Sequence, residues 1–258
     1  MVYQTCFLFS IPFSFALAAF VFSGSVCSYN FHWYLTPPHV QEPSAKEVWN
    51  ICNKRIHLIL FIIGLVGAGV CSLLLVKHWF WLGITAFLTF LYSAPKISHP
   101  AFSSLRNIAL GKTIFLAFAW MHVTTLLPLV MNLHSLDMHH VWFAVNRFFY
   151  IYAICILFDY RDVEEDRKAG IKSLITFVHE KGVDILFWGS VAVVAVTQFL
   201  LLDYFTIAET IALLIPVVIL SLLYYPSKTS FSDYLYYFVL DGLMMLSAPL
   251  LLLIKFAR

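Results

Sequence analysis

Long apolar stretches recur along the whole chain, and they constrain its fold more than any other feature. Each is close to the roughly 20 residues that an α-helix needs to cross a bilayer. Such repetition excludes a single signal peptide or membrane anchor as the explanation. The sequence therefore predicts a multi-pass membrane protein, with eight spans at residues 6–29, 57–76, 79–95, 114–132, 140–158, 183–202, 205–225 and 233–254.

The expected fold class is all-α, a polytopic membrane bundle of about eight helices. None of the apolar runs shows the alternation of polar and apolar positions that β-barrel strands require. The composition agrees, since 61% of the residues are hydrophobic and only 12% are charged. Pro12 and Pro216 fall inside expected spans, which membrane helices tolerate. The longest polar connection, residues 31–56, joins spans of one bundle, so we expect a single domain over residues 1–258.

Charge and cysteine content exclude two other classes of protein. The net charge is +2 and the basic residues are dispersed, so the chain lacks the footprint of nucleic-acid binding. The five cysteines have no C-x-x-C spacing, and most lie in or beside apolar segments. Neither a disulfide framework nor a zinc site is predicted.

The distribution of lysine and arginine predicts an orientation in the membrane. Eight spans divide the loops into two sets, and one set carries 12 of the 16 basic residues. By the positive-inside rule this set is cytoplasmic. Arg147 lies just inside an expected span on the opposite side, where we expect it to be an interfacial anchor. The 12 cytoplasmic basic residues are Lys46, Lys54, Arg55, Lys96, Arg106, Lys112, Arg161, Arg167, Lys168, Lys172, Lys181 and Lys228.

An unusual concentration of acids follows the apolar run that ends at residue 158. Five of the eight residues at 159–166 are Asp or Glu, in a chain with only 14 acids. If the helix of span 140–158 continues for two more turns, Asp159, Asp162 and Asp166 fall within about 60° of one another at 100° per residue. Three carboxylates on one stripe are suited to sharing a hard cation such as Mg²⁺.

Electrostatics favours a cation at this position. The acids are expected at the C-terminal end of a helix, where the helix macrodipole and the neighbouring like charges both disfavour them. The alternative is a solvated turn beside the membrane, in which Arg161, Arg167 and Lys168 neutralise the acids.

The string "DYRDVEEDRKAGIKSL" resembles the second aspartate-rich motif of the UbiA family of intramembrane prenyltransferases. That motif follows the pattern Asp/Asn-x-x-Asp-x-x-x-Asp, and a basic residue, a Gly and Thr/Ser-Leu come after it. The resemblance implies that Asp162 and Asp166, and then Asp159, bind Mg²⁺ that holds the diphosphate of an isoprenyl donor. The residues that match in order are Asp159, Asp162, Asp166, Arg167, Gly170, Ser173 and Leu174.

Four basic residues could contact the diphosphate oxygens if the resemblance holds. For each of them, a role in membrane orientation without any ligand remains the alternative. These residues are Lys96, Arg106, Lys112 and Lys172.

The first motif of that family, Asn-x-x-x-Asp-x-x-x-Asp, is degenerate in this chain. Asn30 is present, but Tyr34 and Pro38 stand where the two aspartates should be. The motifs also follow the first and fifth expected spans, one helix earlier than in the family, so we expect one N-terminal helix to be lacking. "LYSAPKISHP", with Tyr92, is similar to the loop in which the family has Tyr-Ser-x-Pro.

Asn30, Tyr92 and Asp241 are expected to line the central cavity. Asp241 lies near the middle of the last expected span, where a carboxylate is costly and marks a functional site by default. A structural hydrogen bond between helices is the alternative for this residue.

The resemblance implies an integral-membrane prenyltransferase that depends on Mg²⁺. It would transfer an isoprenyl group from an isoprenyl diphosphate to an aromatic or lipid acceptor, and nothing in the sequence selects that acceptor. The rival is a UbiA-like protein that binds an isoprenoid or lipid diphosphate without turnover, as the degenerate first motif suggests. The expected partners are the two substrates and the bilayer, with no protein partner implied.

Overall fold

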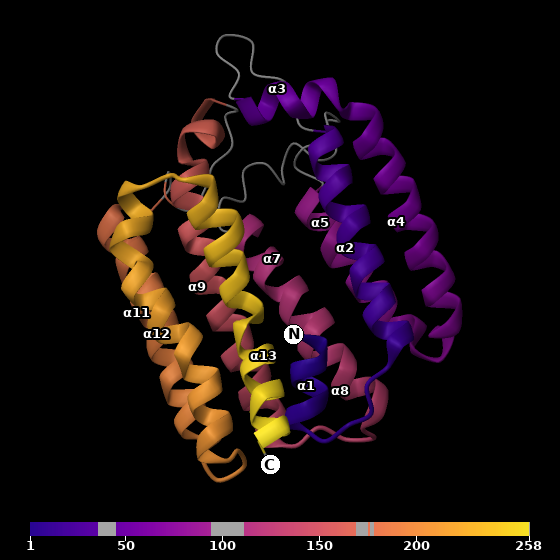
Figure 1. The fold of residues 1–258 in the computed structure, drawn as a ribbon, viewed down its shortest axis with the longest axis vertical. Helices are drawn as coiled ribbons and strands as arrows, with labels where there is room; N and C mark the ends of the chain where they lie inside the picture. The colour runs from indigo at the N-terminus through magenta and orange to yellow at the C-terminus, as the bar shows by residue number, and fades with distance from the viewer. Residues whose placement is uncertain (36–44, 94–110, 169–174, 176–177, 258) are drawn as a thin grey trace. The chain divides into compact units, whose positions relative to one another are not determined.

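The computed structural model describes residues 1–35, 45–93, 111–168, 175 and 178–257. These residues form helices and no strand (Figure 1), so the expected all-α class is confirmed for the described part of the chain. In chain order the main helices are α1 (Val2–Leu8), α2 (Phe15–Leu35), α3 (Ala45–Cys52), α4 (Lys54–Leu74), α5 (Trp79–Ser93), α7 (Gly111–Met121), α8 (Leu127–Asn132), α9 (Met138–Lys168), α11 (Glu180–Phe199), α12 (Ile207–Thr229) and α13 (Asp241–Ala257). A 3₁₀ turn, η1 (Val76–His78), precedes α5, and π-helical segments, η4 (His122–Leu126) and η5 (Tyr234–Leu240), precede α8 and α13.

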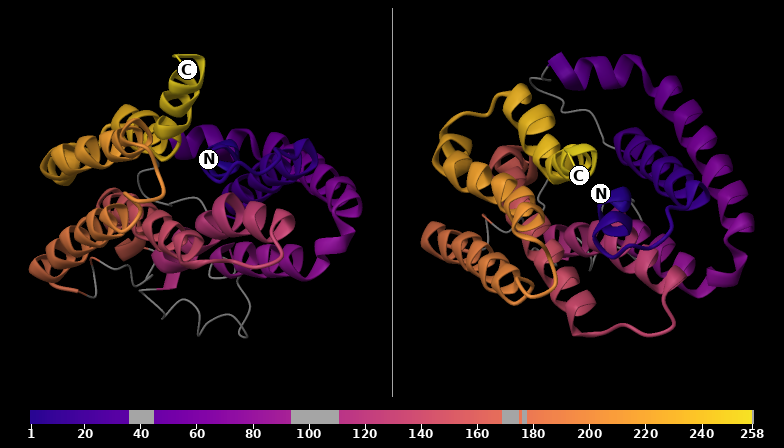
Figure 2. Two further views of the ribbon diagram at one scale, coloured as in Figure 1. Left: turned by 90° about the horizontal axis from the view of Figure 1, so that it is seen from below. Right: turned by 60° about the horizontal axis from the view of Figure 1, so that its bottom comes forward.

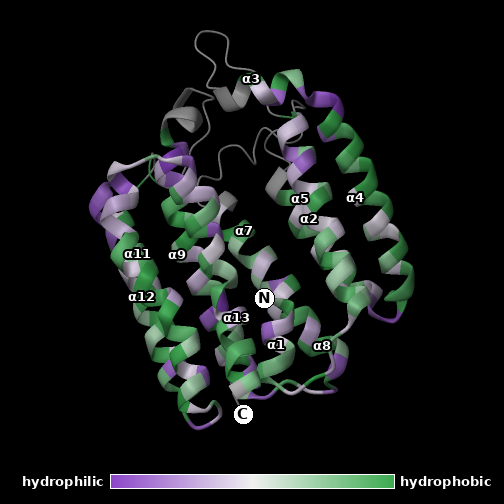
Figure 3. Cartoon of the chain, viewed as in Figure 1, coloured by the Kyte–Doolittle hydropathy of each residue, from purple (hydrophilic) through white to green (hydrophobic). Residues whose placement is uncertain are grey.

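Six helical segments among the described residues are long and apolar enough to cross a membrane, and their hydrophobic colouring is visible in Figure 3. They support the expected multi-pass membrane protein, whereas the count of eight spans is not confirmed. The six segments are Lys54–Leu74, Thr113–Asn132, Met138–Val163, Glu180–Phe199, Ile207–Thr229 and Tyr234–Phe256.

The first expected span, residues 6–29, is wrong as a single helix. The chain leaves the helical conformation after Leu8 and enters it again at Phe15. Ser10 has a φ of 52°, in the left-handed region. Pro12 restricts the residue before it to extended conformations, which explains why the helix breaks here. Pro216, by contrast, does lie inside a helix, α12.

The third expected span, residues 79–95, is helical throughout its described part. Helix α5 covers Trp79–Ser93, and residues 94 and 95 lie outside the described residues.

The chain divides into two compact units, which we describe separately. Unit 1 comprises Met1–Phe13 and Asn107–Arg258, and unit 2 comprises Ser14–Arg106. Unit 1 therefore contains α1 and all helices from α7 onward, and unit 2 contains α2 to α5. The single domain expected over residues 1–258 stays a prediction.

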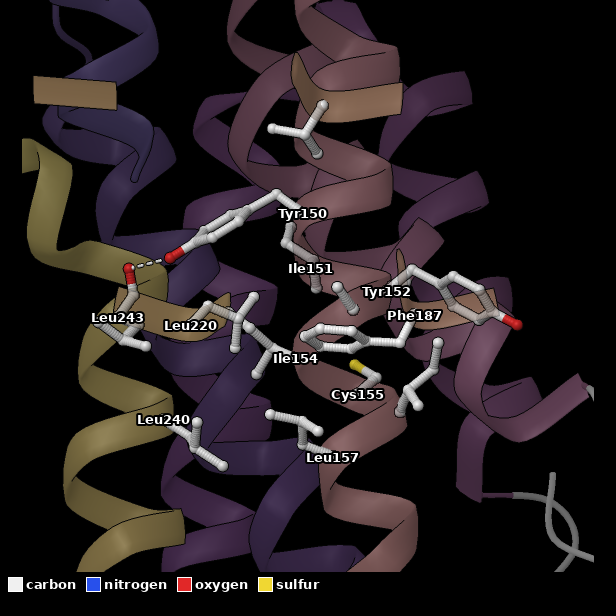
Figure 4. Close-up of a cluster of buried hydrophobic side chains, with 14 of the residues drawn as sticks. Tyr150, Ile151, Tyr152, Ile154, Cys155, Leu157, Phe187, Leu220, Leu240 and Leu243 are labelled. Atoms are coloured by element: carbon white, nitrogen blue, oxygen red, sulfur yellow. Dashed lines mark hydrogen bonds between the residues drawn. The ribbon is translucent and has the colours of Figure 1, made fainter. Parts of the chain in front are cut away.

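Unit 1 is organised around α9. This helix contacts α7, α11, α12 and α13, and it runs side by side with α11 and α12 (Figure 2). Its apolar residues Ile151, Ile154 and Leu157 are almost completely buried, together with Phe187 of α11 and Leu220 of α12 (Figure 4). The helix that carries the acidic motif is thus the central helix of a packed core.

Unit 2 is built on the pair α2 and α4. The two helices approach so closely at Gly64 that a Cβ atom there would lie 2.5 Å from the backbone nitrogen of Cys27. Small residues that allow such close approach are the usual basis of helix pairing in membranes. The α2–α4 contact therefore depends on a glycine at position 64.

Candidate functional site

The acidic motif lies on the last third of α9, which continues to Lys168. The condition set for the acidic stripe, a helix that continues beyond residue 158, is therefore met. At 100° per residue, the Cα positions of Asp159, Asp162 and Asp166 fall within about 60° of one another around the helix axis. The side chain of Asp166 lies outside the described residues, so the geometry of the site rests on Asp159 and Asp162.

Asp159 is a buried carboxylate with a defined partner. Its side chain is 4% exposed, and the Thr113 hydroxyl donates a hydrogen bond of 2.7 Å to its Oδ2 atom. Thr113 is itself buried, near the start of α7, and the contact between α7 and α9 brings the two residues together. Sequence reasoning missed Thr113, because a threonine 46 residues away carries no local signal of this contact.

Asp162 is paired with its neighbour Arg161. Both Nε and Nη2 of the guanidinium lie 2.7 Å from Oδ1 of the carboxylate. The solvated turn considered above assigned Arg161 a neutralising role, and the structure shows this pair for Asp162. The Arg161 and Asp162 side chains are only 16% and 22% exposed, so this pair is largely shielded from solvent.

Aromatic rings surround the other faces of the Arg161 guanidinium. Its Cζ atom lies 5.0 Å from the ring centre of Phe158, 5.4 Å from that of Tyr236 and 4.4 Å from that of Tyr237. Cation–π attraction in such a setting contributes about 0.5–2 kcal/mol for each favourable contact. Nη1 is buried and has no hydrogen-bond partner among the described residues. One donor of Arg161 is therefore available to an anion.

The expected macrodipole penalty applies to fewer acids than the sequence indicated. The dipole acts within the last turn of a helix. Lys168 is the last described residue of α9, and Asp159 and Asp162 precede it by nine and six residues, which is more than one turn in each case. The free-energy cost of ionising Asp159 and Asp162 therefore comes from burial and from repulsion between like charges. The helix dipole adds little at these two positions.

The carboxylates match the donor chemistry of Mg²⁺ only in part. The described residues contain no group of three or more His, Cys, Asp or Glu side chains that could hold a metal ion. Two carboxylates on one helix face are nevertheless present, and Mg²⁺ in proteins is usually held by one or two carboxylates with substrate phosphates. The donor set fits an ion that is bound together with a phosphate ligand.

Most of the basic residues expected at the diphosphate lie beyond the described chain. Lys96, Arg106 and Lys172 are outside the described residues. Lys112 is the second residue of α7, and although its side chain is not described, its backbone is adjacent to Thr113. Lys112 is therefore one residue from the contact that holds Asp159.

The three residues expected to line the cavity are distributed over both units. Asn30 lies on α2 in unit 2, where its amide donates to the Val26 carbonyl and its Oδ1 lies 2.9 Å from Nδ1 of His57. Tyr92 lies in α5 with its side chain outside the described residues. Asp241 is the first residue of α13, within electrostatic reach of Arg161. Their role in lining a cavity stays a prediction.

Tyr34 and Pro38 are the residues that the resemblance aligns with two aspartates. Tyr34 lies near the end of α2 with 38% of its surface exposed, and Pro38 is outside the described residues.

A second polar cluster in unit 1 packs against α9 and was not predicted. Lys228 of α12 lies 2.6 Å from Glu180 and 3.0 Å from Asp184, both of α11, and Asp184 also accepts a hydrogen bond from Tyr224. The Lys228 ammonium also lies 5.2 Å from the ring centre of Tyr160, beside Asp159. The sequence did contain a signal for this cluster, because residues four apart share one face of a helix. Glu180 and Asp184 have this spacing on α11, and Tyr224 and Lys228 have it on α12.

No family model matches the chain, and neither a curated protein nor a solved structure matches it. The likeness to the UbiA family therefore rests on the motif and on the expected order of spans.

Proposed function

We propose that this chain is an integral-membrane, prenyltransferase-like protein that binds an isoprenyl diphosphate with Mg²⁺ at the acidic end of α9. The observation that carries the proposal is the pair of carboxylates on one face of α9, Asp159 held by Thr113 and Asp162 held by Arg161. Restrained carboxylates at low exposure are suited to a metal–phosphate complex, because little ordering remains to be done on binding.

Each described residue of the site has a role in this proposal. Asp159 and Asp162 would be the metal ligands, with Asp166 as the third. Arg161 would donate through Nη1 to a diphosphate oxygen, since that atom is buried and has no partner among the described residues. Bound Mg²⁺ would stabilise the negative charge of the leaving pyrophosphate.

The reaction class follows from the ligand. The bond between C1 of the isoprenyl chain and the diphosphate oxygen breaks, and the pyrophosphate departs with the electron pair. A nucleophilic aromatic or lipid acceptor then forms a bond to C1 and releases a proton. The rings of Phe158, Tyr236 and Tyr237 around Arg161 would help to keep water from the allylic cation.

A second candidate, a binder without turnover, is favoured by Tyr34 at the place of a first-motif aspartate. Both candidates share the diphosphate site and differ in chemistry. The test is release of pyrophosphate from farnesyl or geranylgeranyl diphosphate, with a panel of aromatic and lipid acceptors and a titration of Mg²⁺. The enzyme is expected to release pyrophosphate at high Mg²⁺, because one carboxylate set is missing.

Tyr34→Asp sharpens this test, because it restores the family's Asn-x-x-x-Asp. We expect it to lower the Mg²⁺ requirement by about 10-fold, the lower end of the losses seen when metal-site support is removed. Unchanged Mg²⁺ dependence would show that another group has replaced the first motif. Binding without release by any acceptor would favour the binder.

We also propose that the acidic end of α9 faces the cytoplasm, on the basis of the 12 basic residues in one set of loops. A thiol reagent that cannot cross the membrane should fail to label Glu164→Cys from outside intact cells and should label it in inverted vesicles. Labelling from outside would contradict the orientation.

A further inference from the structure

A second charged position lies deep in unit 1, far from the acidic end of α9. Arg147 is 3% exposed, so the interfacial anchor expected from the sequence is wrong. It lies nine residues after the first residue of α9, about 14 Å along the helix axis at 1.5 Å per residue. A guanidinium stays protonated in proteins, so this is a buried positive charge.

The partners of Arg147 are neutral. Its Nη2 atom donates to the Met244 carbonyl at 3.2 Å, and its Cζ atom lies 4.9 Å from the ring centre of Tyr150. Tyr150 in turn donates to the Leu243 carbonyl at 2.6 Å (Figure 4). Within the described chain Arg147 makes no ion pair with a carboxylate. A buried charge without a counter-ion costs several kcal/mol, which an anion would remove.

Unpartnered polar side chains lie on the helices that pack around this position. Gln4 of α1 is 1% exposed, and neither its amide nitrogen nor its amide oxygen has a partner among the described residues. The same holds for the buried hydroxyls of Thr125 in η4 and Ser247 in α13. Unit 1 has other buried polar atoms without a partner among the described residues, those of Gln198, Thr210 and Ser227 for example. Gln4, Thr125 and Ser247 are the ones on the elements that surround Arg147, and buried polar groups are normally hydrogen-bonded.

The elements that carry these groups pack against one another in unit 1. Helix α1 contacts η4 and α13, and α9 contacts the same two elements. The Thr5 hydroxyl donates to the carbonyl of Thr124, the neighbour of Thr125, at 2.7 Å. Ser247 lies three residues, or almost one turn, beyond Met244, whose carbonyl binds Arg147.

We propose that Arg147, with Gln4, Thr125 and Ser247, binds the carboxylate of an otherwise apolar, membrane-soluble ligand. One guanidinium balances one negative charge and matches a carboxylate with two parallel hydrogen bonds. The Met1 amino group is a second basic group near Arg147, but burial and the charge of Arg147 lower its pKa to about 6, which leaves the guanidinium as the main cation at neutral pH. A phosphate monoester carries about 1.5–2 negative charges at that pH, more than one guanidinium balances. The surrounding core is apolar, which favours a ligand whose remainder is hydrocarbon.

This site is separate from the acidic end of α9. Arg147 and Asp159 are 12 residues apart on one helix, about 18 Å along its axis. One small anionic group cannot contact both residues. The proposal therefore does not depend on the diphosphate site, and the failure of either leaves the other standing.

The test is binding of dodecanoate to the purified full chain in nanodiscs, measured by calorimetry. Dodecanol, which lacks the carboxylate, and dodecyl phosphate are the comparison probes. We expect dodecanoate to bind most tightly of the three. Arg147→Gln should weaken its binding by about 10–100-fold, because a hydrogen-bonded charge partner is lost. Arg147→Lys, which keeps the charge without the bidentate geometry, should recover part of the affinity.

Control variants keep the test decisive. Arg55→Gln removes an exposed cation of unit 2 and should leave dodecanoate binding unchanged. Ser247→Ala is a small change that keeps the fold if Arg147→Gln does not, and it should weaken binding several-fold. The proposal would be overturned if dodecanol bound as tightly as dodecanoate or if dodecyl phosphate bound more tightly. It would also be overturned if dodecanoate binding were insensitive to both Arg147→Gln and Ser247→Ala.

Discussion

The two units use their apolar residues in different ways. In unit 1, 67% of the apolar 18-residue stretch of α9 is buried within the protein. In unit 2, the same fraction for the apolar stretch of α4 is 11%. Both large clusters of buried apolar side chains belong to unit 1. Helix α4 instead presents most of its apolar residues outward, as a lipid-facing helix does.

This difference determines which helices can carry buried polar and charged side chains. Helix α9 carries Asn146, Arg147 and Asp159, all buried, because the neighbouring helices supply partners or surround them. Helix α4 has one buried polar side chain, His57, near its first turn and in contact with Asn30 and Asn50. A central helix can hold charges that a peripheral membrane helix cannot, since lipid offers no partner.

The largest effect should come from the core of unit 1. Phe187 is fully buried and stacks on Tyr224 with ring centres 4.2 Å apart. Phe187→Ala should lower the free energy of unfolding by about 3–5 kcal/mol, because it leaves a cavity. Phe87→Ala in unit 2, at a ring that is 61% exposed, should have almost no effect. Unfolding in mixed micelles of increasing SDS fraction measures both variants, and equal losses would contradict the difference between the units.

The close approach of α2 and α4 should give the next largest effect. Gly64→Leu places a side chain where a Cβ atom already meets backbone at 2.5 Å, so the helices must separate. We expect a loss of about 3 kcal/mol, the upper end of typical overpacking costs. Gly69→Leu, which introduces the same side chain at a position with open space around it, is the matched control. Tolerance of leucine at position 64 would show that unit 2 does not rely on this contact.

The hydrogen bond of Asp159 should have a smaller effect on stability. Thr113→Val keeps the shape of the side chain and removes the donor to a buried carboxylate. A hydrogen bond to a charged group contributes about 1.5 kcal/mol or somewhat more, and this is the expected loss. Thr113→Ser retains the hydroxyl and should keep most of the stability. If valine and serine behave alike, the hydroxyl does not hold Asp159.

The smallest effect concerns Asp137, which precedes α9 outside the spanning segments. Its Oδ1 accepts from the backbone N–H groups of His139 and His140, at 2.9 and 3.2 Å, and so caps the helix. Burial raises the pKa of this carboxyl, but the hydrogen bonds and the charge of His140 lower it more, leaving it below the usual 3.8. The stabilisation is therefore complete above about pH 4 and disappears as the pH falls through the lowered pKa.

Two variants separate capping from titration at this position. Asp137→Ala should cost about 1 kcal/mol at neutral pH, the typical value for a lost N-cap. Asp137→Asn keeps the cap and should remove the contribution of this residue to the loss of stability between pH 4 and pH 2, measured by thermal melting. An unaltered acid profile for Asp137→Asn would contradict the assignment.

Local sequence signals predicted most of the long apolar helices and the position of the acidic stripe, but not α3, which lies in the expected polar connection 31–56. The stripe was derived on the condition that α9 continues past residue 158, and the structure meets that condition. The break at Ser10 was missed because the hydropathy of residues 6–29 is continuous, although Pro12 marked it. The capping box at Thr206 and Glu209, which the structure contains, was also legible as Thr-x-x-Glu.

Contacts between distant helices were not predictable in the same way. Thr113 and Asp159 are joined by the packing of α7 against α9, and no periodicity in the sequence encodes that pairing. Arg147 was misplaced for the same reason. A charge near a span's end predicts an interfacial residue, and only the tertiary fold, with α13 supplying the Met244 carbonyl, shows that it is buried.

The most direct test of the proposed diphosphate site measures thermal stability of the purified chain with farnesyl diphosphate, with and without Mg²⁺. The proposal predicts that the diphosphate raises the melting temperature only when Mg²⁺ is present. Asp162→Asn should abolish that rise, whereas Glu164→Gln, on nearly the opposite side of α9 from Asp159 by helical register, should leave it. Equal losses from both substitutions, or a rise that is independent of Mg²⁺, would contradict a metal–diphosphate site on the Asp159–Asp162 face.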